Sequence, residues 1–209
     1  MNLGLQRLEV GPWPTNCYLV RARPSGRPAT DQLAIVDPGE DANIILQAVG
    51  ETQVCCILLT HGHSDHVGAL EAVLQATGAP VGIHPADADA FGVEADFPLI
   101  DGMEVEIGKG RVTVVHVPGH TPGSVCLRLG GRAVVGDAIF PGGPGHTASP
   151  QALAQSLASL DWTVFRWPDE TELHPGHGTF TTVGAERDAF KRFVAADHPP
   201  GLCGDVAWR

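Results

Sequence analysis

Three histidines and one aspartate lie within six consecutive positions, His61 to His66, of the segment THGHSDHVG. Imidazole and carboxylate groups together are ligands that borderline-soft divalent metal ions such as zinc prefer. Two of the histidines, His61 and His63, are two positions apart, so they point to the same side if the chain there is extended. The pattern predicts a metal site; the alternative is a polar turn that is merely rich in histidine.

The elements around this segment are expected to be a strand before it and a helix after it. The apolar run Val54–Leu59 predicts a buried strand, and apolar residues at helical spacing predict a helix over Val67–Thr77. Asp65 and His66 then lie in the turn that opens this helix. Because the N-terminus of a helix does not attract cations, Asp65 has to supply the negative charge for a metal ion there.

The segment resembles the THxHxDH signature of the metallo-β-lactamase-fold hydrolases. Three further landmarks of that family follow in order: His120 in GHTPGS, Asp137 in VVGDAIF and His177 in HPGHG. The combination is most similar to the glyoxalase II (hydroxyacylglutathione hydrolase) branch, and the resemblance extends from Asn16 to Gly178. It implies an αββα sandwich, in which two mixed β-sheets are flanked by helices, and a binuclear metal centre.

The resemblance also implies a role for each ligand. Three imidazoles would bind one metal ion, an aspartate and two imidazoles would bind a second, and another aspartate would bridge the two ions. The positions are His61, His63 and His120 for the first ion, Asp65, His66 and His177 for the second, and Asp137 for the bridge. We expect zinc, with iron or manganese as alternatives, and a metal-bridging hydroxide as the nucleophile. Asp65 and Asp137 are also the expected catalytic carboxylates.

Short strands and amphipathic helices alternate along the chain, as an α/β sandwich requires. Strands are predicted at Leu5–Val10, Cys17–Ala22, Gln32–Val36, within PVGIHP (80–85), and at Glu104–Ile107, Arg111–Val117, Val125–Leu129 and Ala133–Val135. Helices are predicted at Asp41–Val49, in ADADAF (86–91), after the cap Ser149-Pro150 with Leu153, Leu157 and Leu160 inside, and at Val183–Ala196 with Phe190, Phe193 and Val194 facing inward.

The length of the chain sets its domain organisation. A chain of 209 residues that is 43% hydrophobic can build one large core, so residues 1–209 are expected to form a single domain. Full-length glyoxalase II enzymes continue beyond the equivalent of Gly178 into a helical glutathione-binding domain, which we expect to be missing here. Many relatives carry a GRxDF-type segment after the bridging aspartate, where this chain has FPGGPGHT. In the loop Phe140–Pro150, His146 is a candidate substrate-binding residue.

The charge balance argues against one class of partner. Thirteen basic residues stand against 24 acidic ones, the formal net charge is −11, and no basic run occurs, which disfavours nucleic-acid binding. The opening MNLGLQRLEVG lacks the regions of a signal peptide, and no apolar stretch reaches membrane length. We therefore expect a cytoplasmic protein without a membrane partner. The five cysteines include no CxxC pair and are interpreted as reduced thiols of the core.

Other polar residues are assigned supporting roles. Asp37 resembles the family aspartate that ends an early strand and supports the metal loops by hydrogen bonding. His84 is expected to be structural, and His198 to lie at the surface. His116 and His174 lie shortly before predicted ligands, and core packing is favoured for both over orientation of a ligand imidazole.

The sequence thus predicts a metal-dependent hydrolase of thioester or ester bonds that acts on a small-molecule substrate. A thiolate departs with little need of a proton, whereas an amide needs a proton donor that no motif residue outside the ligand set offers. One alternative is a lactonase of the same mechanism. A second is a persulfide dioxygenase with a single iron on His61, His120 and Asp137, and a third is a metal-binding module without catalytic activity.

Overall fold

In the computed structural model, which describes residues 3–22 and 31–208, two six-stranded β-sheets lie at the centre of the fold. Their strands in chain order are β1 (Gly4–Val10), β2 (Thr15–Arg21), β3 (Gln32–Val36), β4 (Gln53–Leu58), β5 (Val81–Ile83), β6 (Phe97–Pro98), β7 (Glu104–Ile107), β8 (Gly110–His116), β9 (Val125–Leu129), β10 (Arg132–Gly136), β13 (Glu172–Pro175) and β14 (Thr181–Thr182). The first sheet has the order β1-β2-β3-β4-β5-β6, and the second has the order β14-β13-β10-β9-β8-β7. Both are mixed, because β3 to β6 are parallel in the first and β10 and β13 are parallel in the second. A separate hairpin pairs β11 (Ile139–Phe140) with β12 (Gly143–Pro144).

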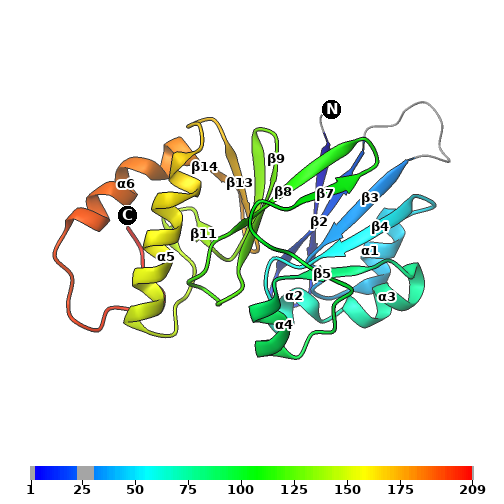
Figure 1. Cartoon of the computed structure of the whole chain (residues 1–209), viewed down its shortest axis with the longest axis horizontal. Helices are drawn as coiled ribbons and strands as arrows, with labels where there is room; N and C mark the ends of the chain where they lie inside the picture. Colours follow the sequence, from blue (N-terminus) through cyan, green and yellow to red (C-terminus); the bar gives the residue numbers. More distant parts are fainter. Residues whose placement is uncertain (1–2, 23–30, 209) are drawn as a thin grey trace.

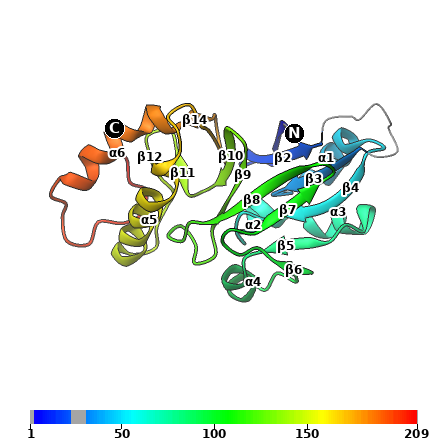
Figure 2. The ribbon, with the colours of Figure 1, turned by 45° about the horizontal axis from the view of Figure 1, so that its top comes forward.

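Helices cover the outer faces of the two sheets. The helices α1 (Ala42–Val49) and α3 (Leu70–Thr77) lie at one end of the long axis, and α5 (Pro150–Trp162) and α6 (Val183–Ala195) at the other, with the sheets between them (Figure 1, Figure 2). The shorter elements are α2 (Ser64–Val67), α4 (Pro85–Phe91) and a 3-10 turn at Val164–Arg166. This is the predicted αββα sandwich. In the described part of the chain, no helix is long and apolar enough to cross a membrane.

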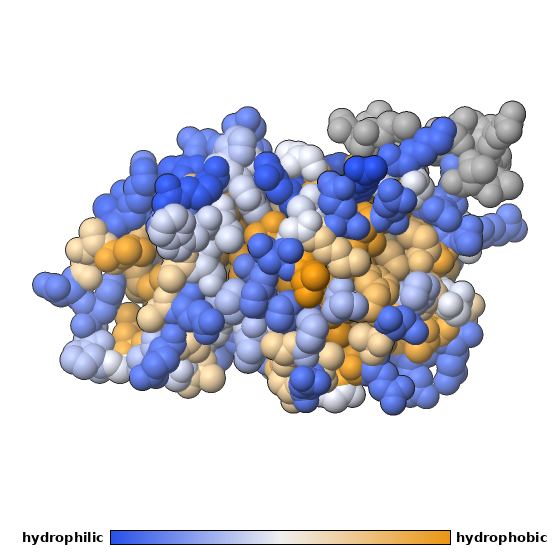
Figure 3. Space-filling model, in the orientation of Figure 1, coloured by the Kyte–Doolittle hydropathy of each residue, from blue (hydrophilic) through white to orange (hydrophobic). Residues whose placement is uncertain are grey.

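Strand β2 shows how one strand serves two layers of the core. Tyr18 and Val20 belong to the cluster between the two sheets, while Cys17 and Leu19 pack with residues of α1 and α3. Side chains alternate between the faces of a strand, so an unbroken apolar run marks a strand that is buried on both faces. A third cluster packs the second sheet against α5 and α6. In Figure 3, hydrophilic side chains occupy much of the outline of the molecule, and a strongly apolar patch lies near the middle of the visible face.

The predicted strands and most of the predicted helices are confirmed, with ends that differ by one or two residues. Ser149 caps α5 as predicted, because its hydroxyl oxygen accepts a hydrogen bond from the N–H of Ala152 at 3.1 Å. The sequence patterns did not predict five short strands, which are β6, β11, β12, β13 and β14. Whether residues 1–209 form one domain stays a prediction, and the outermost residues, 1–2 and 209, lie outside the described ranges.

Two helix predictions are wrong in part. The helix predicted over Val67–Thr77 is interrupted, so that Asp65 and His66 lie in the separate helix α2 and α3 begins only at Leu70. The interruption occurs at Gly68, where an added Cβ would come within 2.4 Å of the carbonyl oxygen of Gly39, so the chain crosses a neighbouring loop there. In α6, Val194 does not face inward: it is 51% exposed, because the last turn of the helix lies at the surface.

Candidate metal centre

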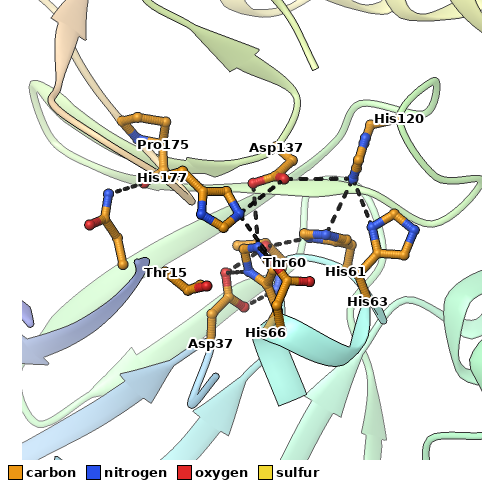
Figure 4. A network of polar contacts seen from close by, with 12 residues as sticks. Thr15, Asp37, Thr60, His61, His63, His66, His120, Asp137, Pro175 and His177 are labelled. Carbon is orange, nitrogen blue, oxygen red and sulfur yellow. Dashed lines mark hydrogen bonds and ion pairs between the residues drawn. The ribbon is translucent and has the colours of Figure 1, made fainter. Parts of the chain in front are cut away.

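Seven side chains converge where the loops of the two sheets meet (Figure 4). The first sheet contributes the turn after β4 together with α2, and the second contributes the loops that follow β8, β10 and β13. The donor atoms form three overlapping groups, and within each group they lie within 4.8 Å of one another. The structure thus brings together all of the predicted metal ligands, which are His61, His63, Asp65, His66, His120, Asp137 and His177.

The first predicted ligand set consists of three imidazoles. Nε2 of His120 lies 3.3 Å from Nε2 of His61 and 3.0 Å from Nδ1 of His63. Burial, with the charges of neighbouring histidines, lowers the pKa of His61 well below its usual value, so this ring is neutral at physiological pH. Three ring nitrogens at such distances could bind one cation together.

The second predicted set lies directly beside the first. Nε2 of His177 lies 3.1 Å from Oδ2 of Asp65, and Nε2 of His66 lies 3.8 Å from the same oxygen. Hydrogen bonding to His177 lowers the pKa of Asp65 to about 2, so its carboxylate is charged near neutral pH. The ring centroids of His61 and His66 are only 4.1 Å apart, which makes the two sets immediate neighbours.

Asp137 lies between the two sets. Its Oδ1 is 3.4 Å from Nε2 of His66, and its Oδ2 is 3.8 Å from Nε2 of His120 and 3.6 Å from Nε2 of His177. Burial opposes its charge, but the nearby His66 outweighs that effect and lowers the pKa of Asp137. One charged carboxylate therefore faces imidazoles of both sets, which is where a bridging ligand would have to lie.

Contacts outside the centre fix the orientation of two ligand imidazoles. Nδ1 of His120 donates to the carbonyl oxygen of His146, and Nδ1 of His177 donates to the carbonyl oxygen of Pro14, both at 2.8 Å. A carbonyl can only accept, so Nδ1 of each ring carries a proton and Nε2 is the ring nitrogen that faces the centre. Such partners orient ligand imidazoles in metal proteins.

Asp37 performs the same task for two further imidazoles, as predicted. Its carboxylate accepts hydrogen bonds from the N–H of Thr60 at 2.7 Å, from the Thr60 hydroxyl at 2.6 Å and from Nδ1 of His66 at 3.0 Å. The Thr60 hydroxyl has thereby used its proton and can accept from Nδ1 of His61 at 3.1 Å. Asp37 is fully buried and has a left-handed backbone (φ 51°), a strain of about 1–3 kcal/mol that these bonds offset.

Two buried atoms of the centre, Nε2 of His66 and Oδ1 of Asp137, make no hydrogen bond within the described ranges. Leaving a buried polar atom unpaired costs about 1–3 kcal/mol, so such atoms usually indicate a missing partner. A divalent metal ion held by these residues would supply a partner to both atoms. The donor set of five imidazoles and two carboxylates therefore fits a pair of divalent cations of the zinc type.

A supporting residue that the sequence did not indicate is Asp87 of α4. This buried carboxylate accepts hydrogen bonds from the N–H of Gly62 at 3.0 Å, from the N–H of Gly123 at 2.6 Å and from the hydroxyl of Thr121 at 2.7 Å. It thereby joins the first ligand turn to the loop of His120. The segment ADADAF offers two aspartates in a short helix, and nothing in its pattern shows which of them is buried.

The segment that carries His177 is held by β2. The amide Nδ2 of Asn16 donates to the carbonyl oxygens of Pro175 and Gly178, each at 2.9 Å, and the Tyr18 hydroxyl donates to that of Pro175 at 2.6 Å. Asn16 and Tyr18 are both buried. The first sheet thus fixes a ligand loop that belongs to the second sheet.

His146, the candidate substrate-binding residue, makes two contacts near the centre. Its carbonyl oxygen accepts from His120, and its Nδ1 lies 3.0 Å from Oδ1 of Asp205. Its side chain remains 58% exposed. A role in substrate binding stays a prediction, because the contacts described here involve the protein alone.

The residues 202–208, called the strap below, pack along the loop that contains His146. Gly204 and Thr147 exchange two backbone hydrogen bonds, of 2.8 and 3.2 Å, and the N–H of Trp208 donates to the carbonyl oxygen of Gly142 at 2.9 Å. The strap therefore fixes the loop whose carbonyl group orients a metal ligand. Neither motif nor periodicity indicated this pairing.

The remaining histidines lie outside the ligand groups. His84 accepts a hydrogen bond from the N–H of Ala86 and stacks on His116 with ring centroids 4.1 Å apart, as a structural residue would. His174 lies 3.1 Å from Glu172 and packs against Tyr18. The predicted surface position of His198 agrees with its exposure. The five cysteines Cys17, Cys55, Cys56, Cys126 and Cys203 are free thiols, and three of them are buried.

Comparisons with known proteins point in the same direction as this geometry. The family model described as the metallo-beta-lactamase superfamily matches residues 10–177. The hydroxyacylglutathione hydrolase of Anaeromyxobacter dehalogenans (strain 2CP-C) is 41% identical over 148 residues, which cover 69% of this chain and 56% of that protein. ETHE1 from Myxococcus xanthus has a TM-score of 0.77 at 30% identity, over 88% of this chain and 81% of that one. TTHA1623 in a di-iron-bound form has a TM-score of 0.69 at 32% identity, over 87% and 96%.

The matched region extends from the end of β1 to His177, so it includes every residue of the three ligand groups. It also includes Asp37 and Asp87, which hold those ligands in place. The same region contains all of the first sheet except most of β1, and the second sheet except β14. Fold, ligand geometry and sequence similarity thus agree over the same stretch, and the chain belongs to the metallo-beta-lactamase superfamily.

Proposed function

We propose that this member of the superfamily is a binuclear metal-dependent hydrolase that cleaves thioester or ester bonds of small molecules. The observation that supports the proposal most is the position of Asp137, whose largely buried carboxylate faces His66 at 3.4 Å and His120 at 3.8 Å. A centre for one ion would not need the second set of donors beside it. The similarity to a hydroxyacylglutathione hydrolase supports the thioester as substrate.

The residues of the chain divide the work of such a centre. Two divalent cations bound there would supply a hydroxide near neutral pH and polarise the carbonyl group of the scissile bond. Asp137 keeps the two ligand sets at a fixed separation, and Asp37 holds imidazoles of both sets through Thr60 and His66. We propose zinc as the metal, with iron as the alternative because a similar protein has been solved in a di-iron-bound form.

A nucleophile from the protein is not required. Three of the five cysteines are buried, and burial raises the pKa of the thiols of Cys17 and Cys126. A protonated thiol is a poor nucleophile. None of the cysteines belongs to the ligand groups of the described residues.

The leaving group decides which substrates suit the centre. A thiolate leaves readily without a proton, whereas an amine does not. The Nδ1 protons of His120 and His177 are engaged by carbonyl groups outside the centre, so these ligands do not offer a proton to a leaving group. Thioesters and activated esters should therefore be cleaved faster than amides.

A substrate panel tests the proposal. The metal-loaded protein should hydrolyse acyl thioesters of several thiols and should leave the corresponding amides intact. Simple esters and lactones belong in the same panel, because a lactonase would share the centre and differ only in substrate. No turnover of any thioester, ester or lactone by protein with full metal content would refute the proposed function.

The rival function is a persulfide dioxygenase with one iron on His61, His120 and Asp137. The two functions differ in the role of His177, which lies 3.1 Å from Asp65 in the second set and is a metal ligand only in the hydrolase. In a hydrolase the wild type should bind about two ions per chain, and His177→Ala should lose about one of them together with most hydrolysis. His198→Ala is the matched surface control and should lose neither. One iron per chain with persulfide-dependent oxygen uptake, unchanged in His177→Ala, would establish the dioxygenase instead.

A further inference from the structure

A pocket of about 670 Å³ opens beside the second ligand set. Its lining residues are Trp13, Pro14, Ser64, Asp65, His177 and Gly178. Two of these, Asp65 and His177, belong to the metal centre, so a molecule that fills the pocket has one end at the centre. Trp13 is 81% exposed, although it is a large apolar residue.

The loop that carries Trp13 is held against the centre. The carbonyl oxygen of Pro14 accepts from Nδ1 of His177 at 2.8 Å, and the carbonyl oxygen of Trp13 accepts from the Thr15 hydroxyl at 3.0 Å. Thr15 also pairs with His177 as an isolated β-bridge. The indole therefore projects from a fixed backbone, and a ligand with an apolar surface would cover it without reordering the loop.

Aromatic rings flank the centre on other sides as well. The ring of Phe91 packs edge-on against His63 with centroids 5.1 Å apart, and Phe91 is 39% exposed. The ring of Phe140 lies 6.3 Å from that of His177 at an interplanar angle of 30°. The approach to the centre is therefore lined with apolar faces, of which Trp13 offers the largest exposed area.

The wall of the pocket offers no basic side chain to an anionic substrate. None of its lining residues is a lysine or arginine, and the one acidic residue, Asp65, belongs to the predicted metal ligands. In the described part of the chain, Arg7 approaches it through a hydrogen bond to the carbonyl oxygen of Gly178, and it also lies 3.9 Å from Glu9. Carriers such as glutathione bear carboxylates, which basic side chains would have to neutralise. The charges here favour an uncharged group.

We propose that this pocket binds the uncharged, apolar acyl group of a thioester substrate, with Trp13 as its main wall. The inference rests on the proposed hydrolase function and names the substrate class of that site. Common thiol carriers are polar or charged, whereas acyl groups are often hydrocarbon chains, so the acyl side of the substrate fits an apolar wall better. The physiological substrates would then be apolar acyl thioesters rather than thioesters defined by an anionic thiol.

A series of acyl thioesters of the neutral thiol N-acetylcysteamine tests this proposal in the metal-loaded full chain. From acetyl to hexanoyl, kcat/KM of the wild type should rise by about tenfold or more, because each buried methylene favours binding. Trp13→Ala should remove most of that rise, so that the acetyl and hexanoyl values of the variant lie close together. Trp162→Ala is the matched control, since Trp162 is 75% exposed on α5, and it should behave as wild type. Hexanoyl-glutathione should not be preferred over the neutral thioester.

Binding of a non-hydrolysable thioether, S-hexyl-N-acetylcysteamine, separates this proposal from the proposed function. Trp13→Ala should weaken binding of this thioether about tenfold, and Trp162→Ala should not. This result would support the pocket even if no thioester were cleaved, and only the hydrolase function would then fail. Three kinetic results would overturn the acyl pocket. The first is a wild-type kcat/KM that does not change with acyl length, and the second is a loss of kcat/KM in Trp13→Ala that is equal for all chain lengths. The third is a preference for the glutathione thioester. Thioether binding that is absent or independent of Trp13 would overturn it as well.

Discussion

At the scale of single residues, the metal centre depends on a close approach that only glycine allows. A Cβ on Gly176 would come within 2.1 Å of Oδ1 of Asp137 and 2.5 Å of Cε1 of His66. We expect Gly176→Ala to displace both side chains, to reduce bound metal below two ions per chain and to lower hydrolysis by about 100-fold or more. Metal analysis and steady-state kinetics check this. Gly131→Ala is the control, since a Cβ there meets no atom within 4 Å, and equal behaviour of the two variants would contradict the argument.

His66 should report metal binding through its proton. Burial disfavours its charged form, but the carboxylates of Asp37 and Asp137 outweigh burial and raise the pKa of His66 to about 10. In the metal-free protein the charged ring therefore adds stability below the ordinary pKa of 6.5, and this contribution is lost as the pH rises through about 10. Near neutral pH its proton must leave before Nε2 can bind a metal ion, so metal affinity should increase with pH.

Calorimetry in buffers of different protonation enthalpy counts the protons released by this ligand. The wild type should release a proton from His66 on binding metal near neutral pH. Asp37→Asn removes one of the two carboxylates, lowers the pKa of His66 and should reduce the release. Metal binding without proton release, or with the same release in Asp37→Asn, would refute the assigned charge state of His66.

At the scale of elements, the sequence predicts what is local and misses what is long-range. The strand β4 and the ligands after it could be predicted, because apolar runs and the spacing of His61 and His63 are patterns within a few residues. Asp87 could not, since its partners Gly62 and Gly123 lie 25 and 36 positions away and leave no periodic trace. The break between α2 and α3 also depends on a distant loop, at Gly39.

The strap is the element for which a long-range prediction can be tested. Nε1 of Trp208 donates to the buried carboxylate of Glu186 at 3.1 Å, and the same carboxylate accepts from the N–H of Gly142 at 3.0 Å. Trp208→Phe keeps an aromatic ring and removes the indole donor, which should lower the free energy of unfolding by about 1–3 kcal/mol. Trp208→Ala also removes the packing and should cost about 3–5 kcal/mol.

A purely structural strap would lower stability alone, whereas this strap also fixes the loop that orients His120. If the Trp208→Ala variant remains folded, a stepwise metal titration should therefore show weaker binding at the site of His120. Binding at the other site should be nearly unchanged. Trp162→Ala, an exposed tryptophan on α5, should alter neither the unfolding free energy nor the titration. Equal weakening of both sites in Trp208→Ala would mean that the strap acts on the fold and not on the His120 ligand set.

At the scale of the whole molecule, the centre joins the two halves of the sandwich. The first sheet supplies His61, His63, Asp65 and His66 through the turn after β4 and α2, and the second supplies His120, Asp137 and His177 through its loops. The core between the sheets is apolar, and the ligands lie where the loops of both sheets meet. A bound metal pair would therefore link segments that are far apart in the sequence.

Because metal ions that bind only the folded state stabilise it by mass action, removing them should destabilise the entire molecule. At a free metal concentration of one hundred times the dissociation constant, the stabilisation is about 2.7 kcal/mol per site. We expect a chelator to lower the midpoint of a single thermal transition by several degrees, and added zinc to restore it. Asp137→Ala, which loses the ligand shared by both sets, should have a low midpoint with or without chelator. If chelation left the wild-type midpoint unchanged, or melted one half of the molecule before the other, the metal pair would not be the link between the two sheets.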